Sequence, residues 1–205
     1  MITLFWCPQT RASRILWLLE EMQEPFEVRL IDIRDPDSKS DADFVAASPM
    51  GKVPAIMDTT PNGVVRMADS ASIALYLADR YPASGLAPKI DDPARGQYLY
   101  WMTYTPGVIE PAMMEKFTGQ EVSRASSGWG NFDAMVEVLE AGLKAGPWLM
   151  GEQFSAADVL VGSSVYFMKM FGILPDSPVL SEYGDRCLAR PAYARALARD
   201  AELET

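Results

Sequence analysis

The feature that most constrains this chain is a pair of short motifs, one around Val53-Pro54 and one at Asp69-Ser70. Residues 48–56 read Ser-Pro-Met-Gly-Lys-Val-Pro-Ala-Ile. A β-branched residue before proline is extended, and its bond to proline adopts the cis form more readily than other peptide bonds. Asp69 and Ser70 stand where an extended segment becomes a helix, and helix N-termini bind anions. Together the motifs predict a surface that holds a short peptide-like ligand, by backbone pairing at Val53 and by head-group contacts at Asp69 and Ser70.

Hydrophobic periodicity predicts an α/β segment followed by an all-helical segment. The α/β segment combines strands at residues 2–5, 26–31, 53–57 and 64–67 with helices at 13–22 and 70–80 and a short helix within 32–47. A Pro-Asn-Gly turn joins the last two strands. The later helices are expected at residues 93–117, 130–145, 155–171, 179–189 and 191–199. We therefore expect two domains, residues 1–78 and 87–205, joined by a linker at residues 79–86.

The composition excludes several classes of function. The 205 residues include no histidine, which excludes Ser-His-Asp and Cys-His catalysis and every histidine-ligated metal site. The formal net charge of −10 argues against binding to nucleic acid or to an anionic membrane. The two cysteines lie far apart, no signal-peptide pattern follows Met1, and no apolar run approaches the length of a membrane span. These features predict a cytoplasmic protein.

Four motifs, in this order and spacing, resemble the glutathione transferase family over nearly the whole chain. They are the opening strand with the turn Trp6–Arg11, the segment Gly51–Ala55, the helix start Asp69-Ser70 and the run Phe154–Asp158. The resemblance implies an α/β plus all-α fold, with an N-terminal thioredoxin-like domain and a C-terminal helical bundle domain. It also implies a homodimer that uses glutathione as co-substrate. We interpret the last motif as a helix-capping box, which stabilises the fold and is not a site.

The turn after the first strand carries three candidates for the group that faces the glutathione sulfur. Cys7 precedes Pro8, a residue favoured at the first helical position, and helix N-termini stabilise thiolates. Since this pair resembles the Cys-type, omega-like transferases, we expect Cys7 to be the catalytic residue. Thr10 is the main alternative, because it resembles the hydroxyl with which Ser-type, theta-like enzymes stabilise the glutathione thiolate. Ser13 is the third candidate, and helix capping is the alternative role for both hydroxyls.

The resemblance also assigns the residues that hold the two ends of glutathione. Asp69 is expected to receive the ligand ammonium, and Ser70 with the helix N–H groups is expected to receive the γ-glutamyl carboxylate. Val53 is expected to pair its backbone with the cysteinyl part, and Pro54 to set the turn. A plain helix N-cap is the alternative role for Asp69 and Ser70.

An anionic ligand needs local positive charge on a chain this acidic. Lys52 and Lys39 are the candidates for the glycyl carboxylate, and Arg11 is the candidate for the mouth of the site. The default alternative for Arg11 is a solvated surface residue. Arg14 matches an arginine of the family that holds the first helix in place.

Two functional hypotheses follow. The first is an enzyme that conjugates glutathione to a hydrophobic electrophile, or that performs glutathione-dependent thiol transfer on a disulfide through Cys7. The second is a non-catalytic binding or regulatory protein with the same fold. The second substrate is expected to contact an aromatic and methionine-rich stretch, for which domain or dimer core is the alternative role: Trp101, Met102, Tyr104, Met113, Met114 and Phe117.

Overall fold

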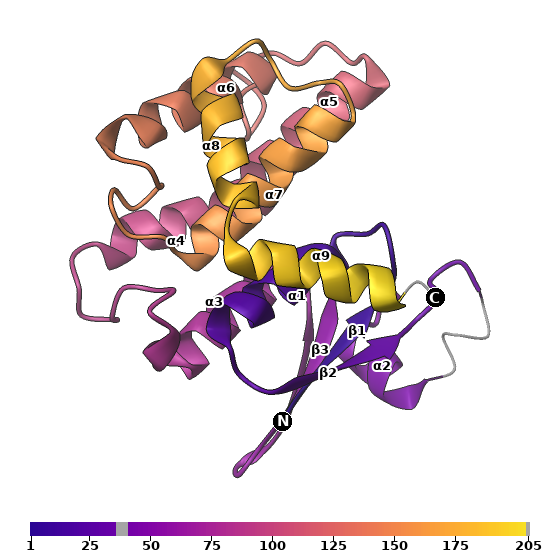
Figure 1. Cartoon of the computed structure of the whole chain (residues 1–205). Coiled ribbons are helices and arrows are strands. Elements are labelled where there is room, and N and C mark those ends of the chain that lie inside the picture. Colours follow the sequence, from indigo (N-terminus) through magenta and orange to yellow (C-terminus); the bar gives the residue numbers. More distant parts are fainter. Residues whose placement is uncertain (36–40, 204–205) are drawn as a thin grey trace. The chain divides into compact units, whose positions relative to one another are not determined.

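The computed structural model describes residues 1–35 and 41–203, and the chain divides into two compact units (Figure 1). Unit 1 combines Met1–Ser84 with Arg190–Thr205, and unit 2 is Gly85–Ala189. Unit 1 contains all the strands of the sheet, and unit 2 is helical. The expected succession of a thioredoxin-like α/β domain and a helical domain is therefore confirmed.

Unit 1 is built on a mixed sheet of four strands in the order β2-β1-β3-β4. Its strands are β1 (Ile2–Trp6), β2 (Phe26–Leu30), β3 (Ala55–Thr60) and β4 (Gly63–Ala68). β1 pairs parallel with β2 and antiparallel with β3, and β3 pairs antiparallel with β4. The β3–β4 hairpin turns at Pro61-Asn62, within the predicted turn. β3 begins two residues later than expected, because Val53 and Pro54 lie in the preceding loop.

Helices cover both faces of this sheet. They are α1 (Ala12–Met22), α2 (Ala42–Ala47) and α3 (Ser70–Arg80), followed by a short 3-10 helix, η2 (Pro82–Ser84). On β3, Asp58 points to α3, where it accepts a hydrogen bond of 2.8 Å from the Tyr76 hydroxyl. Arg66 on β4 lies opposite the neighbouring residue of β3 and pairs with Asp43 of α2 at 2.7 Å. Since successive residues of a strand face opposite sides, α2 and α3 lie on opposite faces.

The last helix, α9 (Pro191–Leu203), packs against α1 and belongs to unit 1 (Figure 1). The guanidinium of Arg190 donates two hydrogen bonds to the carboxylate of Glu21, at 2.5 and 2.7 Å. One turn into α9, Arg195 donates to a carboxylate oxygen of Glu20 at 3.0 Å. The pair between Arg190 and Glu21 is bidentate, which is the strongest form of ion pair between side chains.

This packing differs from the expected boundary of the helical domain, residues 87–205. The sequence places α9 next to the helices of unit 2 along the chain, so periodicity alone assigned it to them. The carboxylates at the end of α1 instead bind Arg190, just before α9, and Arg195 within it, and the ring of Trp17 meets that of Tyr193 edge-on at 5.1 Å. Unit 1 is thus made from two separate parts of the chain.

Unit 2 contains α4 (Arg95–Tyr104), α5 (Glu110–Thr118), α6 (Phe132–Gly142), α7 (Ala156–Met170) and α8 (Pro178–Leu188). The long helix expected at residues 93–117 is interrupted by a π-helical turn, η3 (Thr105–Ile109). Pro106 lies in this turn and has no N–H to donate, so the regular α-helical bonding is broken there. A short 3-10 helix, η4 (Leu143–Ala145), extends α6.

The predicted capping box at the start of α7 is present, and it is larger than the sequence indicated. Asp158 accepts hydrogen bonds from the Ser155 N–H at 2.9 Å and the Ser155 hydroxyl at 3.0 Å. Its other oxygen accepts from the Leu149 N–H at 2.9 Å and the Tyr183 hydroxyl at 3.1 Å. Asp158 is fully buried. Through these hydrogen bonds it joins α7 to α8 and to the loop that precedes α7.

The buried carboxyl of Asp158 predicts a specific dependence of stability on pH. Burial raises its pKa to about 6 from an ordinary 3.8, although its hydrogen bonds act in the opposite direction. The folded protein therefore binds this proton more tightly than the unfolded chain, so the contribution of Asp158 to the free energy of unfolding falls as pH rises from about 4 to about 6. The free energy of unfolding of Asp158→Asn, taken relative to that of wild type, should therefore rise by about 2 kcal/mol between pH 4 and pH 7, as measured by urea unfolding. A pH-independent difference between the two proteins would contradict this prediction.

Candidate functional site

The register of the sheet brings the predicted site segments to one end of unit 1. Phe5 near the end of β1 lies opposite Ala55 at the start of β3, and Ala55 lies opposite Ala68 at the end of β4. The turn after β1, the Val53-Pro54 segment before β3 and Asp69 after β4 therefore emerge at the same edge. This convergence is the geometry that the two sequence motifs predicted.

The turn after β1 is held by the hydroxyl of Thr10. This hydroxyl donates a hydrogen bond of 2.6 Å to the carbonyl of Cys7 and accepts one of 3.2 Å from the Ala12 N–H. Ser13 donates from its hydroxyl to the carbonyl of Thr10 at 3.0 Å. Both side chains are half-buried, and both hydroxyl hydrogens are engaged within the turn. The N-cap of α1 is Arg11 and has no side-chain cap hydrogen bond, so neither residue caps the helix in the way the alternative role proposed.

The prediction that the first helix begins at Pro8, directly after Cys7, is wrong. α1 begins at Ala12, with Arg11 at its N-cap, so Pro8 lies in the turn and not at the first helical position. The hydrogen bonds of Thr10 form this intervening turn and delay the helix. Cys7 is only 1% exposed, and it does not form a disulfide. Its thiol thus lies beside the predicted site but is covered in this conformation.

The Val53-Pro54 segment is held rigidly by a buried serine. The peptide bond between Val53 and Pro54 is cis, as the sequence indicated, and both residues are buried. The Ser48 hydroxyl donates to the carbonyl of Lys52 at 2.7 Å and accepts from its N–H at 2.9 Å. Gly51, between them, has φ +64°, a backbone conformation that glycine adopts without strain. The side chain of Lys52 is exposed.

Asp69 combines a helix cap with a strained backbone. It is the N-cap of α3, and its Oδ1 accepts from the Ala71 N–H at 3.0 Å and the Ser72 N–H at 3.1 Å. Its Oδ2 has no partner among the residues that the structure describes, and the side chain is exposed. Its φ of +78° is unusual for a residue other than glycine, and such strain concentrates at ligand sites. Ser70, beside it, is buried.

The predicted basic residues differ in their positions. Arg11 and Lys52 are exposed, and each lies on one of the segments that converge at this edge. Arg14 is 2% exposed on α1, as expected for a residue with a structural role. Lys39 lies outside the described residues, so its assignment to the glycyl carboxylate stays a prediction.

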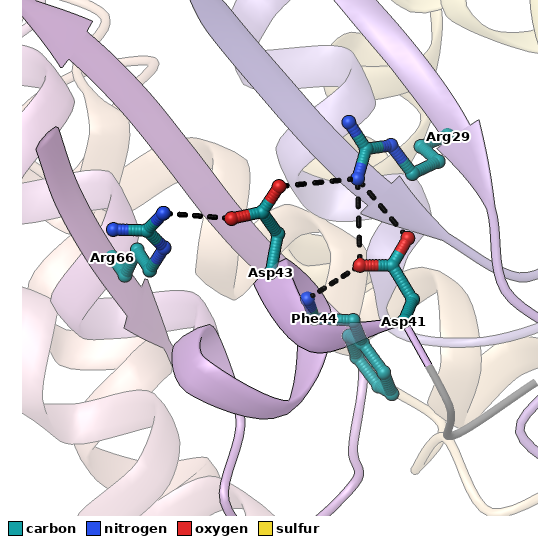
Figure 2. Close-up of polar contacts among 5 residues, drawn as sticks. All are labelled: Arg29, Asp41, Asp43, Phe44 and Arg66. Atoms are coloured by element: carbon teal, nitrogen blue, oxygen red, sulfur yellow. Dashed lines mark hydrogen bonds and ion pairs between the residues drawn. The ribbon is translucent and has the colours of Figure 1, made fainter.

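Sequence reasoning missed a group of charged residues that holds α2, which we call the α2 clasp: Arg29, Arg66, Asp41 and Asp43. Figure 2 shows Asp43 between the two arginines, at 3.6 Å from Arg29 and 2.7 Å from Arg66. Arg29 also pairs with Asp41 at 3.0 Å, and Asp41 caps α2 by accepting from the Phe44 N–H. Desolvation raises the pKa of Asp41, but these two partners outweigh it and lower the pKa below 3.8. These pairs join two strands to a helix, and no spacing in the sequence indicates them.

The aromatic and methionine-rich stretch of unit 2 divides into a buried and an exposed part. Trp101, Met102, Tyr104 and Met113 are buried, which agrees with the core alternative for these four. Met114 and Phe117 on α5 are 58% and 48% exposed. The ring of Phe117 meets that of Phe171 edge-on at 5.3 Å.

Within residues 1–35 and 41–203, neither a membrane-spanning helix nor a cluster of metal ligands is found. No helix there is long and apolar enough to cross a bilayer. No group of three or more acidic or cysteine side chains is placed there to hold a metal ion.

Comparison with known families gives two matches that follow the two parts of the fold. Residues 6–80 match the family model described as Glutathione S-transferase, N-terminal domain. Residues 92–186 match the model described as Glutathione S-transferase, C-terminal domain.

Individual relatives match over nearly the full length of the chain. The Disulfide-bond oxidoreductase YfcG of Escherichia coli K12 is 26% identical, over 96% of this chain and 94% of the relative. Glutathione S-transferase GstB of the same strain is 25% identical, over 92% and 93%. Among solved structures, a glutathione transferase from Methylococcus capsulatus has a TM-score of 0.79 at 29% identity, over 98% of this chain and 99% of that chain. A sphingomonad glutathione S-transferase complexed with glutathione has a TM-score of 0.77 at 25% identity, over 97% and 98%.

Proposed function

The chain belongs to the glutathione S-transferase family, and we propose that it binds glutathione at the edge of unit 1 and conjugates it to a hydrophobic electrophile. The observation that carries the proposal is the Oδ2 of Asp69, which has no partner within residues 1–35 and 41–203 and is held on a strained backbone next to the Val53-Pro54 segment. A reaction of this kind would serve detoxification. Structures of similar proteins with bound glutathione support the choice of ligand.

Each part of glutathione has a counterpart at this edge. The ammonium group pairs with the Oδ2 of Asp69, and the neighbouring carboxylate accepts from the Ser70 hydroxyl and from N–H groups at the start of α3. The cysteinyl backbone pairs with that of Val53, in the way that a peptide adds to a strand, and Pro54 sets the turn. The glycyl carboxylate meets Lys52, and Arg11 adds positive charge at the mouth of the site. Lys39 is proposed as a second contact of that carboxylate from the sequence alone.

We assign stabilisation of the glutathione thiolate to Thr10. Its hydroxyl hydrogen bonds to the Cys7 carbonyl in the structure, so rotation about the C–O bond redirects it to the sulfur. The Ala12 N–H meanwhile continues to donate to the hydroxyl oxygen, which polarises the O–H bond and strengthens it as a donor. A hydrogen bond to the thiolate favours the charged form, which is the nucleophile. Ser13 keeps the turn in place through the Thr10 carbonyl.

A second candidate function is glutathione-dependent disulfide exchange through Cys7. The relative named a disulfide-bond oxidoreductase and the thiol on the same turn favour it. The Cys7 thiolate attacks the sulfur of a glutathione mixed disulfide and releases the other thiolate. A second glutathione then displaces Cys7 and leaves as glutathione disulfide. This route requires the turn to open, because Cys7 is buried.

Asp69→Asn tests the binding mode. Asparagine keeps an oxygen that caps the helix but removes the charge that pairs with the ligand ammonium. We expect calorimetric titration to show a Kd for glutathione at least about tenfold higher than wild type, with an unchanged melting temperature. No binding of millimolar glutathione to the wild-type protein would contradict the proposed function. Binding without turnover of any electrophile or disulfide would favour the non-catalytic alternative.

Paired variants of the turn test the choice between Thr10 and Cys7. Thr10→Val preserves shape and removes the hydroxyl, so we expect conjugation of a chlorinated aromatic substrate to fall about a hundredfold. Cys7→Ala should leave conjugation within about twofold of wild type. The opposite pattern, with loss of disulfide reduction in Cys7→Ala and trapping of a glutathione–Cys7 mixed disulfide, would establish the second candidate function.

We also propose that the protein is a homodimer, as the resemblance to the family implies. Large apolar side chains are exposed on both units, including Met50 at 83% and Tyr100 at 48%. We propose that a second copy of the chain covers these residues. Light scattering at micromolar concentration should give about twice the chain mass of 22.6 kDa, and a value near 22.6 kDa would refute the dimer.

We place the protein in the cytoplasm. Cys7 and Cys187 are both buried and not joined by a disulfide, which suits a reducing compartment. Fractionation of the source cells would test this location.

A further inference from the structure

The α2 clasp spans the sheet from edge to edge. Arg29 comes from β2 and Arg66 from β4, which are the two outer strands of the sheet. Both side chains reach α2 between them, and both bind Asp43 (Figure 2). The helix is therefore held from two sides by groups that are far apart in the sequence.

Packing alone gives α2 little support. It has six residues, of which only Phe44 and Ala47 are buried. The ring of Phe44 meets that of Phe5 at 5.6 Å, and the guanidinium of Arg29 lies over the same Phe5 ring at 5.2 Å. Arg29 thus touches both the polar cap and the apolar contact of the helix. Isolated helices this short are unstable in water, so contacts to the sheet determine its position.

The charged side chains of the clasp are only partly exposed. The exposed fractions are 40% for Arg29, 26% for Asp41, 36% for Asp43 and 34% for Arg66. Single exposed ion pairs contribute little, but a connected network with fixed geometry contributes more. Here the carboxylate of Asp43 links the two arginines into one network.

The end of α2 leads directly into the segment that pairs with glutathione in the proposed function. The Ser48 N–H donates to the Phe44 carbonyl at 2.7 Å, so the loop begins on the last turn of α2. The Ser48 hydroxyl then binds both backbone groups of Lys52, and the Gly51 N–H donates to the Ser48 carbonyl at 2.8 Å. Ser48 is 2% exposed. A shift of α2 therefore moves the backbone before Val53.

We propose that the α2 clasp positions the Ser48–Pro54 segment for glutathione, so that Arg29, Arg66 and Asp43 are positioning residues of a site that none of them touches. This inference rests on the proposed function. Removing a clasp charge lets α2 sample displaced positions, and only the clasped population binds the ligand well. The observed Kd then equals the Kd of the clasped state divided by the fraction of molecules that remain clasped.

The test compares Arg66→Gln, Asp43→Asn and the double variant with Arg66→Lys, which keeps the charge. Arg124→Gln is the matched control, because Arg124 forms an exposed pair with Glu137 at 2.8 Å in unit 2. Calorimetry should give a Kd for glutathione about fivefold higher in Arg66→Gln, near wild type in Arg66→Lys and unchanged in Arg124→Gln. The double variant should bind glutathione no more weakly than Asp43→Asn alone, because Asp43→Asn already breaks the pair with Arg66.

Two further readouts separate positioning from a general loss of stability. Turnover at saturating glutathione should stay within about twofold of wild type in Arg66→Gln, since bound ligand selects the clasped state. Hydrogen exchange should accelerate in residues 42–53 and stay unchanged in α3. A Kd that is unchanged in Arg66→Gln while wild type binds glutathione would overturn this inference alone. Failure of wild type to bind glutathione would overturn the proposed function and this inference with it, and accelerated exchange would then identify the clasp as structural only.

Discussion

The antiparallel pairing of β3 with its two neighbours is the constraint on which the candidate site depends. The pairs Phe5–Ala55 and Ala55–Ala68 place the end of β1, the start of β3 and the end of β4 in one row. A slip of one residue in either ladder would turn every side chain of a strand to the other face. It would also separate the Thr10 turn, the Val53-Pro54 segment and Asp69, which lie at the same edge of the sheet only because of this register.

Features with a local cause could be predicted from the sequence. The start and end of α3 at Ser70 and Arg80 follow from the cap at Asp69 and from the apolar spacing after it, and both agree with the structure. The cis bond at Val53-Pro54 and the capping box at Ser155 have equally local causes. Each of these features depends on residues within about one helical turn of each other, so the chain itself carries the signal.

Features that join distant residues could not be predicted in the same way. The carboxylate of Asp43 finds one partner on β2 and another on β4, and nothing in the spacing of these residues indicates a contact. The predicted helix start at Pro8 was wrong for a different reason. Pro8 suits a helix start, but the hydroxyl of Thr10 closes a turn that moves the start to Ala12. A single side-chain hydrogen bond overrode a sound statistical preference.

The return of α9 to unit 1 has a consequence for how the protein is made. Unit 2 is one continuous stretch, whereas unit 1 needs residues from before and after it. A ribosome therefore delivers Glu20 and Glu21 long before it delivers the arginines that bind them. All residues of unit 2 are synthesised before unit 1 is complete. Unit 2 can therefore fold while the surface of α1 that later binds α9 is still exposed. The first part of unit 1 is synthesised early but completes its packing late, because its contacts with α9 form only after synthesis of unit 2 has ended.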